Sequence, residues 1–289
     1  MEPYITIITP THNIIENQQM DDFNRLVSML DIQTYKNIEH LVIDNASTDG
    51  TVEVLKEYKN KGYLNFYSEK DMGKFGAYNK GIIRANGKYV AFLSCDDFLH
   101  DITAIQDVVN MLETNKGDFS YSPAYCRHPD GYTFLFQPAI YNVFQVMPCA
   151  RQAMFFRKAV LERENFFDEK LKYLADFDLI IRLMMKKCKG LFFDGNYTTY
   201  KFGQKVLDNN DQVELESKMI FNKNYRKLLP MNDTTLSGLV NTSTFPAELL
   251  EKLSTFFPPE DKELFLERCE TMRKIREQAL ASQNVNQAE

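Results

Sequence analysis

The feature that most constrains the fold of this chain is the regular alternation of strand-like and helix-like segments in its first 100 residues. β-branched and apolar runs at 4–9, 38–43, 64–68 and 88–94 alternate with helix-like patterns at 24–33, 51–59 and 77–85. Such alternation predicts an α/β fold in which helices cover a mainly parallel sheet. In sheets of this kind, ligands bind outside the carboxyl ends of the strands.

Polar residues follow three of these predicted strands at the point where each strand ends. They are Thr9-Pro10-Thr11, Asp44-Asn45 and Asp96-Asp97. Any one of these loops could be polar simply because loops face water. Their joint placement at three strand ends instead predicts one shared ligand site.

The pair Asp96-Asp97 directly follows the apolar run 90–93. Two adjacent carboxylates repel each other, and a divalent cation relieves that repulsion. Oxygen ligands suit Mg²⁺ or Mn²⁺, and such an ion can neutralise a diphosphate leaving group. The alternative is that one aspartate only caps the helix that follows.

Two further segments offer polar and flexible groups. Asp44 and Asn45 can both accept hydrogen bonds from a nucleobase edge, and Asn45 can also donate one. The stretch 69–81 is rich in glycine and lysine, so its backbone can approach a ligand closely and Lys74 or Lys80 could contact a phosphate. A surface loop leading into a helix is the competing interpretation for either lysine.

Five motifs in order carry a resemblance to a known family. They are TPTHN (9–13), VIDNASTDGT (42–51), SEKDMGKFGAYNKGI (68–82), ANGKYVAFLSCDD (85–97) and YLADFDLIIRL (173–183). Together they resemble the family 2 glycosyltransferases, which have the GT-A fold of the nucleotide-diphospho-sugar transferases. The resemblance covers roughly residues 4–183, and no further motif is identified beyond about residue 210.

The resemblance implies an inverting transfer of a sugar from a nucleotide-diphospho-sugar, a UDP-sugar by analogy, to a hydroxyl of a glycan or lipid-linked sugar. Cell-surface polysaccharide synthesis is the pathway implied. The site residues carried over are Thr9 (with Pro10 and Thr11 beside it), Asp44 and Asn45 for the nucleobase, Asp71 and Lys80 for the donor cleft, Asp96 for ribose and metal, Asp97 for Mn²⁺ or Mg²⁺, and Asp176 as general base.

The chain departs from the family pattern at three positions. Many relatives have Glu-Asp where this chain has Ala175-Asp176, and many have a second aspartate where it has Asn45. Some have a histidine in the stretch that here contains Arg151, for which we expect a surface ion pair rather than a ligand contact. Asp178 ranks second to Asp176 as base, because it points elsewhere once the helix has begun.

Composition and charge indicate where the protein acts and which classes of partner it does not bind. The net charge of -6 disfavours a nucleic-acid binder, and the five scattered cysteines indicate neither a disulfide framework nor a zinc site. The sequence shows no signal peptide and no apolar run long enough to span a membrane. We therefore expect a cytoplasmic protein, with peripheral contact at the inner face of the membrane left open.

The expected domains are 1–222, a GT-A domain with halves 1–100 and 101–222, then a helical extension 223–280 and a disordered tail 281–289. The extension contains two amphipathic helices at 246–256 and 260–278, which we expect to pack on the catalytic domain or on a second subunit of a homodimer. A nucleotidyltransferase and a catalytically silent nucleotide-sugar-binding protein remain as alternative functions.

Overall fold

A computed structural model describes residues 4–71, 73–195, 198–201 and 208–286. The chain divides into two compact units, and each is described by itself. Unit 1 comprises Met1–Pro138, Cys149–Ala175 and Cys188–Gln204. Unit 2 comprises Ala139–Pro148, Asp176–Lys187 and Lys205–Glu289.

Unit 1 is built on a seven-stranded sheet with the strand order β10-β6-β9-β4-β1-β2-β3. Its strands are β1 (Ile5–Thr11), β2 (Ile38–Asp44), β3 (Asn65–Ser68), β4 (Tyr89–Phe92), β6 (Phe119–Tyr121), β9 (Met154–Arg157) and β10 (Gly190–Phe192). All neighbours are parallel except β9, which runs antiparallel to both β4 and β6. The prediction of a mixed, mainly parallel sheet is confirmed.

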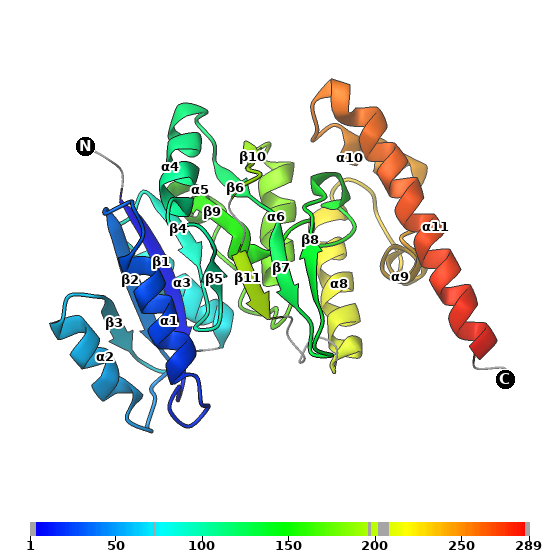
Figure 1. Ribbon diagram of the computed structural model, residues 1–289. Coiled ribbons are helices and arrows are strands. Elements are labelled where there is room, and N and C mark those ends of the chain that lie inside the picture. Colours follow the sequence, from blue (N-terminus) through cyan, green and yellow to red (C-terminus); the bar gives the residue numbers. More distant parts are fainter. Residues whose placement is uncertain (1–3, 72, 196–197, 202–207, 287–289) are drawn as a thin grey trace. The chain divides into compact units, whose positions relative to one another are not determined.

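Helices cover both faces of this sheet (Figure 1). On one face, α1 (Met20–Asp31) and α4 (Ala104–Thr114) share a core with the strands β1, β4 and β9. On the other face, α3 (Lys74–Arg84) packs against β1 and β2. The remaining helices of this unit are α2 (Thr51–Asn60), α5 (Lys158–Arg163) and the 3₁₀ turn η2 (Arg151–Ala153). Both faces are buried, which explains why the strands read as continuous apolar runs.

The contact between α3 and β1 depends on a glycine. A Cβ added at Gly81 would lie 2.4 Å from Cγ2 of Ile8, a distance that real Cβ atoms do not reach. The helix therefore rests on the strand at a separation that only a bare backbone allows. Since α3 follows the glycine- and lysine-rich loop, this packing fixes the position of the C-terminal end of that loop.

A second, four-stranded sheet in unit 1 has the order β5-β11-β7-β8. Its strands are β5 (Phe98–Leu99), β7 (Ala124–Arg127), β8 (Thr133–Phe136) and β11 (Thr198–Lys201). β11 pairs in parallel with β7 and antiparallel with β5. One face is buried through Ala124 and Phe136, which pack with Ala150 and Ala153.

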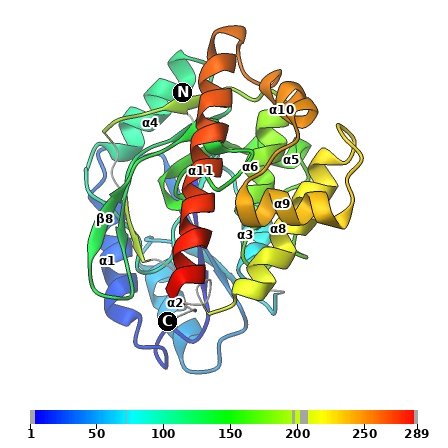
Figure 2. The same cartoon turned by 90° about the vertical axis from the view of Figure 1, so that its right-hand side faces the viewer.

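Unit 2 is helical apart from its connections. It contains η1 (Ile140–Asn142), most of α6 (Ala175–Met185), α8 (Asn210–Tyr225), α9 (Asp233–Thr242), α10 (Ala247–Ser254), η3 (Pro259–Asp261) and α11 (Lys262–Asn286). Phe144, which follows η1, packs edge-to-face against Tyr225, Phe257 and Phe265, so one buried ring contacts both α8 and α11. Figure 2 shows α11 beside α9 and α10, which it contacts.

The compact units divide the chain differently from the expected domains. Residues 208–222 group with the C-terminal helices, as do 139–148 and 176–187, and Phe177 packs edge-to-face on Phe221 there. The helix α11 continues to Asn286, past residue 281 where the tail is expected to begin, through residues such as Ala279 and Ala281 that favour helix. Among the described residues, none of the helices combines the length and apolarity needed to cross a bilayer.

Candidate functional site

Asp44 ties together the ends of three neighbouring strands. Its carboxylate accepts hydrogen bonds from the Thr11 hydroxyl at 3.0 Å, the Ser68 hydroxyl at 2.6 Å, and the Ser47 hydroxyl and N–H at 2.5 and 2.9 Å. Asp44 is fully buried. A carboxylate offers about four lone-pair sites, so these bonds engage all of them. A nucleobase that bonded to Asp44 would have to replace one of these donors.

Asn45 presents a side chain that is only partly engaged. Its Oδ1 accepts from the Asp71 N–H at 2.8 Å, and its backbone carbonyl lies 2.9 Å from Nδ1 of His12. The structure thus brings Thr11, Asp44, Asn45 and Asp71 together, as the sequence predicts. Partial burial raises the pKa of Asp71, against the opposing effects of its bond from the Gly73 N–H and the charges of Lys80 and His12.

Two residues predicted to bind the nucleotide-sugar donor, Thr9 and Lys80, contact other parts of the protein. The Thr9 hydroxyl is fully buried and lies 3.0 Å from Nε2 of His40, so a ligand at the strand end could meet only its backbone. The Lys80 ammonium donates to the Lys70 carbonyl at 2.6 Å and lies 3.5 Å from Glu69. Its donor-binding role stays a prediction.

Asp96 and Asp97 follow β4 and line one pocket of about 330 Å³. The pocket wall also includes Asp22 and Arg25 of α1, Arg127 of β7, and Cys95, Phe98 and Thr199. Asp97 is buried and accepts one hydrogen bond, from the Ser94 N–H at 2.7 Å. Asp96 and Asp97 therefore share a concave site, and at least one carboxylate oxygen of Asp97 takes no part in the hydrogen bond from Ser94.

Burial raises the pKa of Asp97 to about 7, with a further contribution from the neighbouring Asp96. The cations of Arg151 and Lys74 act in the opposite direction. The expectation that Arg151 makes a surface ion pair is wrong. Arg151 is 4% exposed, lies 4.7 Å from the Tyr78 ring centroid and donates to the Phe92 carbonyl at 3.2 Å.

Two more cations at this site were not identified from the sequence. Arg127 donates to the Asp96 carbonyl at 2.9 Å, and the Lys201 ammonium lies 3.4 Å from the Asp96 carboxylate and 3.6 Å from that of Asp22. Lys201 and Arg127 are partners in the register of β11 and β7. Strand pairing brings them together across 74 residues of sequence, and no local motif signals that contact.

These residues fit a divalent cation. Asp96 and Asp97 offer hard oxygen ligands in one pocket, and Mg²⁺ or Mn²⁺ typically takes one or two carboxylates while phosphates and water supply the remaining ligands. Within the described ranges, three or more His, Cys, Asp and Glu side chains do not gather into a metal cluster. The pair is therefore suited to an ion that arrives with a diphosphate.

Asp176 lies in the first turn of α6 in unit 2, one residue after the helix begins. Its Oδ1 accepts the N–H of Phe177 at 2.9 Å. It is thus the second helical residue rather than the cap that precedes the helix, and the positive end of the helix favours its negative charge. Its catalytic role stays a prediction.

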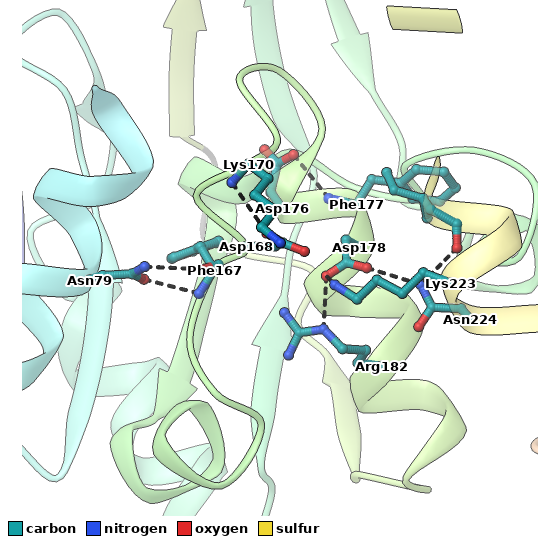
Figure 3. Close-up of polar contacts among 11 residues, drawn as sticks. Asn79, Phe167, Asp168, Lys170, Asp176, Phe177, Asp178, Arg182, Lys223 and Asn224 are labelled. Atoms are coloured by element: carbon teal, nitrogen blue, oxygen red, sulfur yellow. Dashed lines mark hydrogen bonds and ion pairs between the residues drawn. The ribbon is translucent and has the colours of Figure 1, made fainter. Parts of the chain in front are cut away.

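Asp178 has a different environment (Figure 3). It is fully buried and accepts hydrogen bonds from Arg182 at 2.8 Å, Lys223 at 3.0 Å and Asn224 at 2.9 Å. These contacts join α6 to α8 inside unit 2. A carboxylate held by two cations in this way stabilises the helix pair and is poorly placed to take a proton from a substrate.

Comparison with known proteins places this chain in a family. Residues 6–163 match the model of "Glycosyl transferase family 2". The glucosyltransferase WfaP of Escherichia coli, named as acting from UDP-Glc on α-D-GlcNAc-diphosphoundecaprenol, is 38% identical over 93 residues, or 32% of this chain and 37% of WfaP. The chain spans about a third of the length of WfaP and of a glycosyltransferase of Rickettsia conorii that it also matches.

Two solved structures share the fold. Staphylococcus aureus TarS 1-349 in complex with UDP-GlcNAc superposes with a TM-score of 0.58 at 14% identity, covering 94% of this chain and 89% of that TarS fragment. The mannosyltransferase PcManGT of Pyrobaculum calidifontis, in complex with GDP-Man and Mn²⁺, gives 0.58 at 17% identity, covering 100% and 81%.

Proposed function

Because the chain belongs to glycosyltransferase family 2, we propose that it transfers a sugar from a UDP-sugar to an acceptor hydroxyl with inversion, with a divalent metal bound at Asp96 and Asp97. The nucleotide sugar carries the activated bond, and a single displacement at the anomeric carbon inverts its configuration. UDP is the nucleotide in the donor named for WfaP, which supports the choice of donor.

One observation carries the proposal. Two adjacent carboxylates, those of Asp96 and Asp97, line a single pocket. The edge formed by Thr11, Asp44 and Asn45 lies at the ends of β1 and β2, and β4 is the other neighbour of β1. A nucleotide whose base bound at Thr11, Asp44 and Asn45 would place its diphosphate toward the end of β4. Mn²⁺ or Mg²⁺ held there supplies Lewis acidity that stabilises charge on the departing diphosphate.

Cations of the chain assist the same step. Arg127 and Lys201 lie at Asp96, and Arg151 lies buried behind the pocket near Asp97. Positive charges already held in place stabilise developing negative charge without reorganisation during the reaction, and the effect is strongest for a buried cation such as Arg151. We assign to these residues the electrostatic part of leaving-group stabilisation.

Asp176 is the proposed general base. It removes the proton of the acceptor hydroxyl as that oxygen attacks the anomeric carbon, a step that typically contributes about 10²- to 10⁴-fold in rate. The adjacent Ala175 leaves Asp176 as the only carboxylate of the family's Glu-Asp pair. The base therefore acts without the supporting acid found in many relatives.

Donor binding is tested by thermal shift with a panel of nucleotide sugars, each with and without Mn²⁺. A true donor stabilises the folded state in proportion to its affinity, so the expected result is a rise in Tm that depends on metal. UDP-sugars should give the largest rise. A panel in which neither nucleotides nor nucleotide sugars shift the Tm contradicts the proposal.

The base is tested with Asp176→Asn, for which we expect a loss of transfer of about 10²-fold or more with donor binding retained. Asp211→Asn is the matched control, because Asp211 also lies in the first turn of a helix of unit 2. It removes the same favourable interaction with a helix terminus and should leave transfer unchanged. Near-normal turnover of Asp176→Asn assigns the base elsewhere.

The acceptor class follows by analogy with relatives. WfaP is named as acting on a diphosphoundecaprenol-linked sugar, and we propose a lipid-linked sugar in cell-surface polysaccharide synthesis as acceptor for this chain. The reaction would then take place in the cytoplasm, with peripheral contact at the inner face of the membrane.

A further inference from the structure

An apolar groove adjoins the carboxylate pocket in unit 1. The groove, of about 340 Å³, is lined by Asn24, Arg25, Ser28, Met29, Ile32 and Phe98. Arg25 and Phe98 also line the pocket of Asp96 and Asp97. The two cavities therefore meet at these two side chains, and the combined site is polar at one end and apolar at the other.

The apolar end includes side chains that are unusually exposed for their type. Ile32, at the end of α1, is 59% exposed, and Phe98 is 39% exposed. The nearby Ile102 is 52% exposed, and its carbonyl accepts from the Thr34 N–H at 2.8 Å, which holds its loop against the end of α1. Exposed apolar side chains gathered in this way mark a binding surface more often than chance.

Aromatic rings extend the apolar surface across the four-stranded sheet. His100 packs edge-on against both Phe98, at 5.5 Å, and Tyr125, at 5.4 Å between ring centroids. Its Nε2 lies 2.6 Å from the Thr199 hydroxyl, which fixes the ring. Tyr125 then pairs with Leu135 in the register of β7 and β8, and both are more than a third exposed.

The junction between the two cavities carries a cation. The Arg25 side chain is 65% exposed and forms an ion pair with Asp22. Asp22 is also near Lys201, so the acid has a second cation of its own. An anionic group at the junction could therefore pair with Arg25 without leaving Asp22 unpaired.

From this arrangement we propose that the groove binds the hydrocarbon chain of an acceptor whose sugar is attached to that chain through phosphate, with the phosphate at Arg25. The inference rests on the proposed function, because an acceptor hydroxyl must reach the pocket where the donor diphosphate is held. The rest of that acceptor must then leave the pocket, and the exit through Arg25 and Phe98 leads onto apolar surface.

The test uses the full chain with saturating UDP and Mn²⁺, so that the donor site is filled. Calorimetry then compares farnesyl diphosphate with inorganic diphosphate and with farnesol, all below the concentrations at which they aggregate. Burial of the farnesyl methylenes and methyls adds to the affinity, so farnesyl diphosphate should bind at least about tenfold more tightly than inorganic diphosphate. It should also bind more tightly than farnesol, because the alcohol cannot pair with Arg25.

Variants locate the binding surface. Ile32→Gln and Phe98→Ala should each raise the Kd for farnesyl diphosphate by roughly tenfold, the effect of removing a large apolar contact. Arg25→Gln should weaken farnesyl diphosphate but not farnesol. The matched control is Ile83→Gln on α3, since Ile83 is 61% exposed and lies outside the groove; it should change none of these affinities.

Three results would overturn the inference. Farnesyl diphosphate could bind no more tightly than inorganic diphosphate, or Ile32→Gln could behave like Ile83→Gln. The protein could also form a dimer in light scattering that Ile32→Gln dissociates, which would assign the groove to a second copy of the chain. Metal-dependent stabilisation by nucleotide sugars, measured on the same wild-type sample, reports separately on the proposed function.

Discussion

The ends of β2 and β4, the two strands that flank β1, both carry a buried aspartate, yet the two carboxylates differ in how fully they are bonded. Asp44, the last residue of β2, accepts four hydrogen bonds from three residues. Asp97 after β4 accepts one, from the Ser94 N–H. Both are at most 3% exposed, so burial alone does not distinguish them.

This difference indicates which of the two aspartates stabilises the fold and which can bind a ligand. A buried carboxylate with all its lone pairs engaged gains stability from those bonds and has little capacity left for a ligand. A buried carboxylate with few bonds retains the cost of desolvation, which a metal ion or a proton can relieve. In the sequence, both positions are simply acids at strand ends.

The largest effect that this comparison predicts is on activity at the end of β4. Asp97→Asn should lower kcat by about 10³-fold, because the loss of a metal ligand removes several kcal/mol of leaving-group stabilisation. The same change should leave the metal-free Tm unchanged or raise it, since it removes a poorly solvated charge. Steady-state kinetics with Mn²⁺ and a melt in EDTA measure the two quantities.

An outcome in which Asp97→Asn melted well below the wild type would give Asp97 the structural role that we assign to Asp44. Retained transfer at Mn²⁺ concentrations that saturate the wild type would remove Asp97 from the metal site.

The next effect is a pair of opposite pH dependences. Burial lowers the pKa of His40, on β2, to about 4 from 6.5, so its contribution to stability is present above pH 6.5 and is lost as the pH falls to 4. Each pKa unit is worth about 1.36 kcal/mol, so the loss is roughly 3 kcal/mol. The raised pKa of Asp97, about 7 against 3.8, has the reverse sign: stability is gained as the pH falls from 7 to 3.8.

The two contributions oppose each other between pH 6.5 and 4, and variants should separate them. In urea unfolding with EDTA, Asp97→Asn should lose stability on acidification more steeply than the wild type, and His40→Gln less steeply. The Gln side chain can keep a bond to the Thr9 hydroxyl. Parallel slopes in all three proteins would mean that neither group titrates in this window.

A smaller loss is expected at the end of β2. Asp44→Ala should lower the free energy of unfolding by about 3 kcal/mol, because it leaves the buried Thr11 hydroxyl and the donors of Ser47 and Ser68 without their acceptor. Urea unfolding at pH 7 measures the change. A loss below that of a single hydrogen bond would show that the three strand ends hold together without this carboxylate.

The smallest effect comes from removing one donor of the same set. Ser68→Ala should cost about 1 kcal/mol at most, because the hydrogen bond that it removes comes from an exposed serine. Donor binding, followed by the Tm shift with UDP and Mn²⁺, should remain. If Ser68→Ala instead weakened UDP binding by tenfold or more, the Ser68 hydroxyl would belong to the donor site rather than to the scaffold.

The sequence predicted much of unit 1, because its parallel strands are apolar on both faces and are punctuated by turns. The expected strand 38–43 is β2, Ile38–Asp44, and the expected helix 51–59 is α2, Thr51–Asn60. The helices α4 and α8 were not predicted. The grouping of 139–148 with the C-terminal helices depends on ring packing between distant segments, which no local pattern encodes.

The site was predictable where one motif supplies neighbouring groups and not where packing does. Asp96 and Asp97 are adjacent in sequence and share a pocket. The cations beside them come from β7, β11 and the turn η2, which only the folded sheets bring near. Arg151 was expected on the surface because arginine is seldom buried, but its ring contact and its bond to Phe92 compensate part of that burial.

The glycine that lets α3 rest on β1 also limits how donor preference can be redesigned. The segment from Glu69 to Gly73 enters α3 directly, and any side chain at Gly81 would collide with Ile8. Loops exchanged between enzymes of this fold would therefore have to keep the helix register from Lys74 to Gly81.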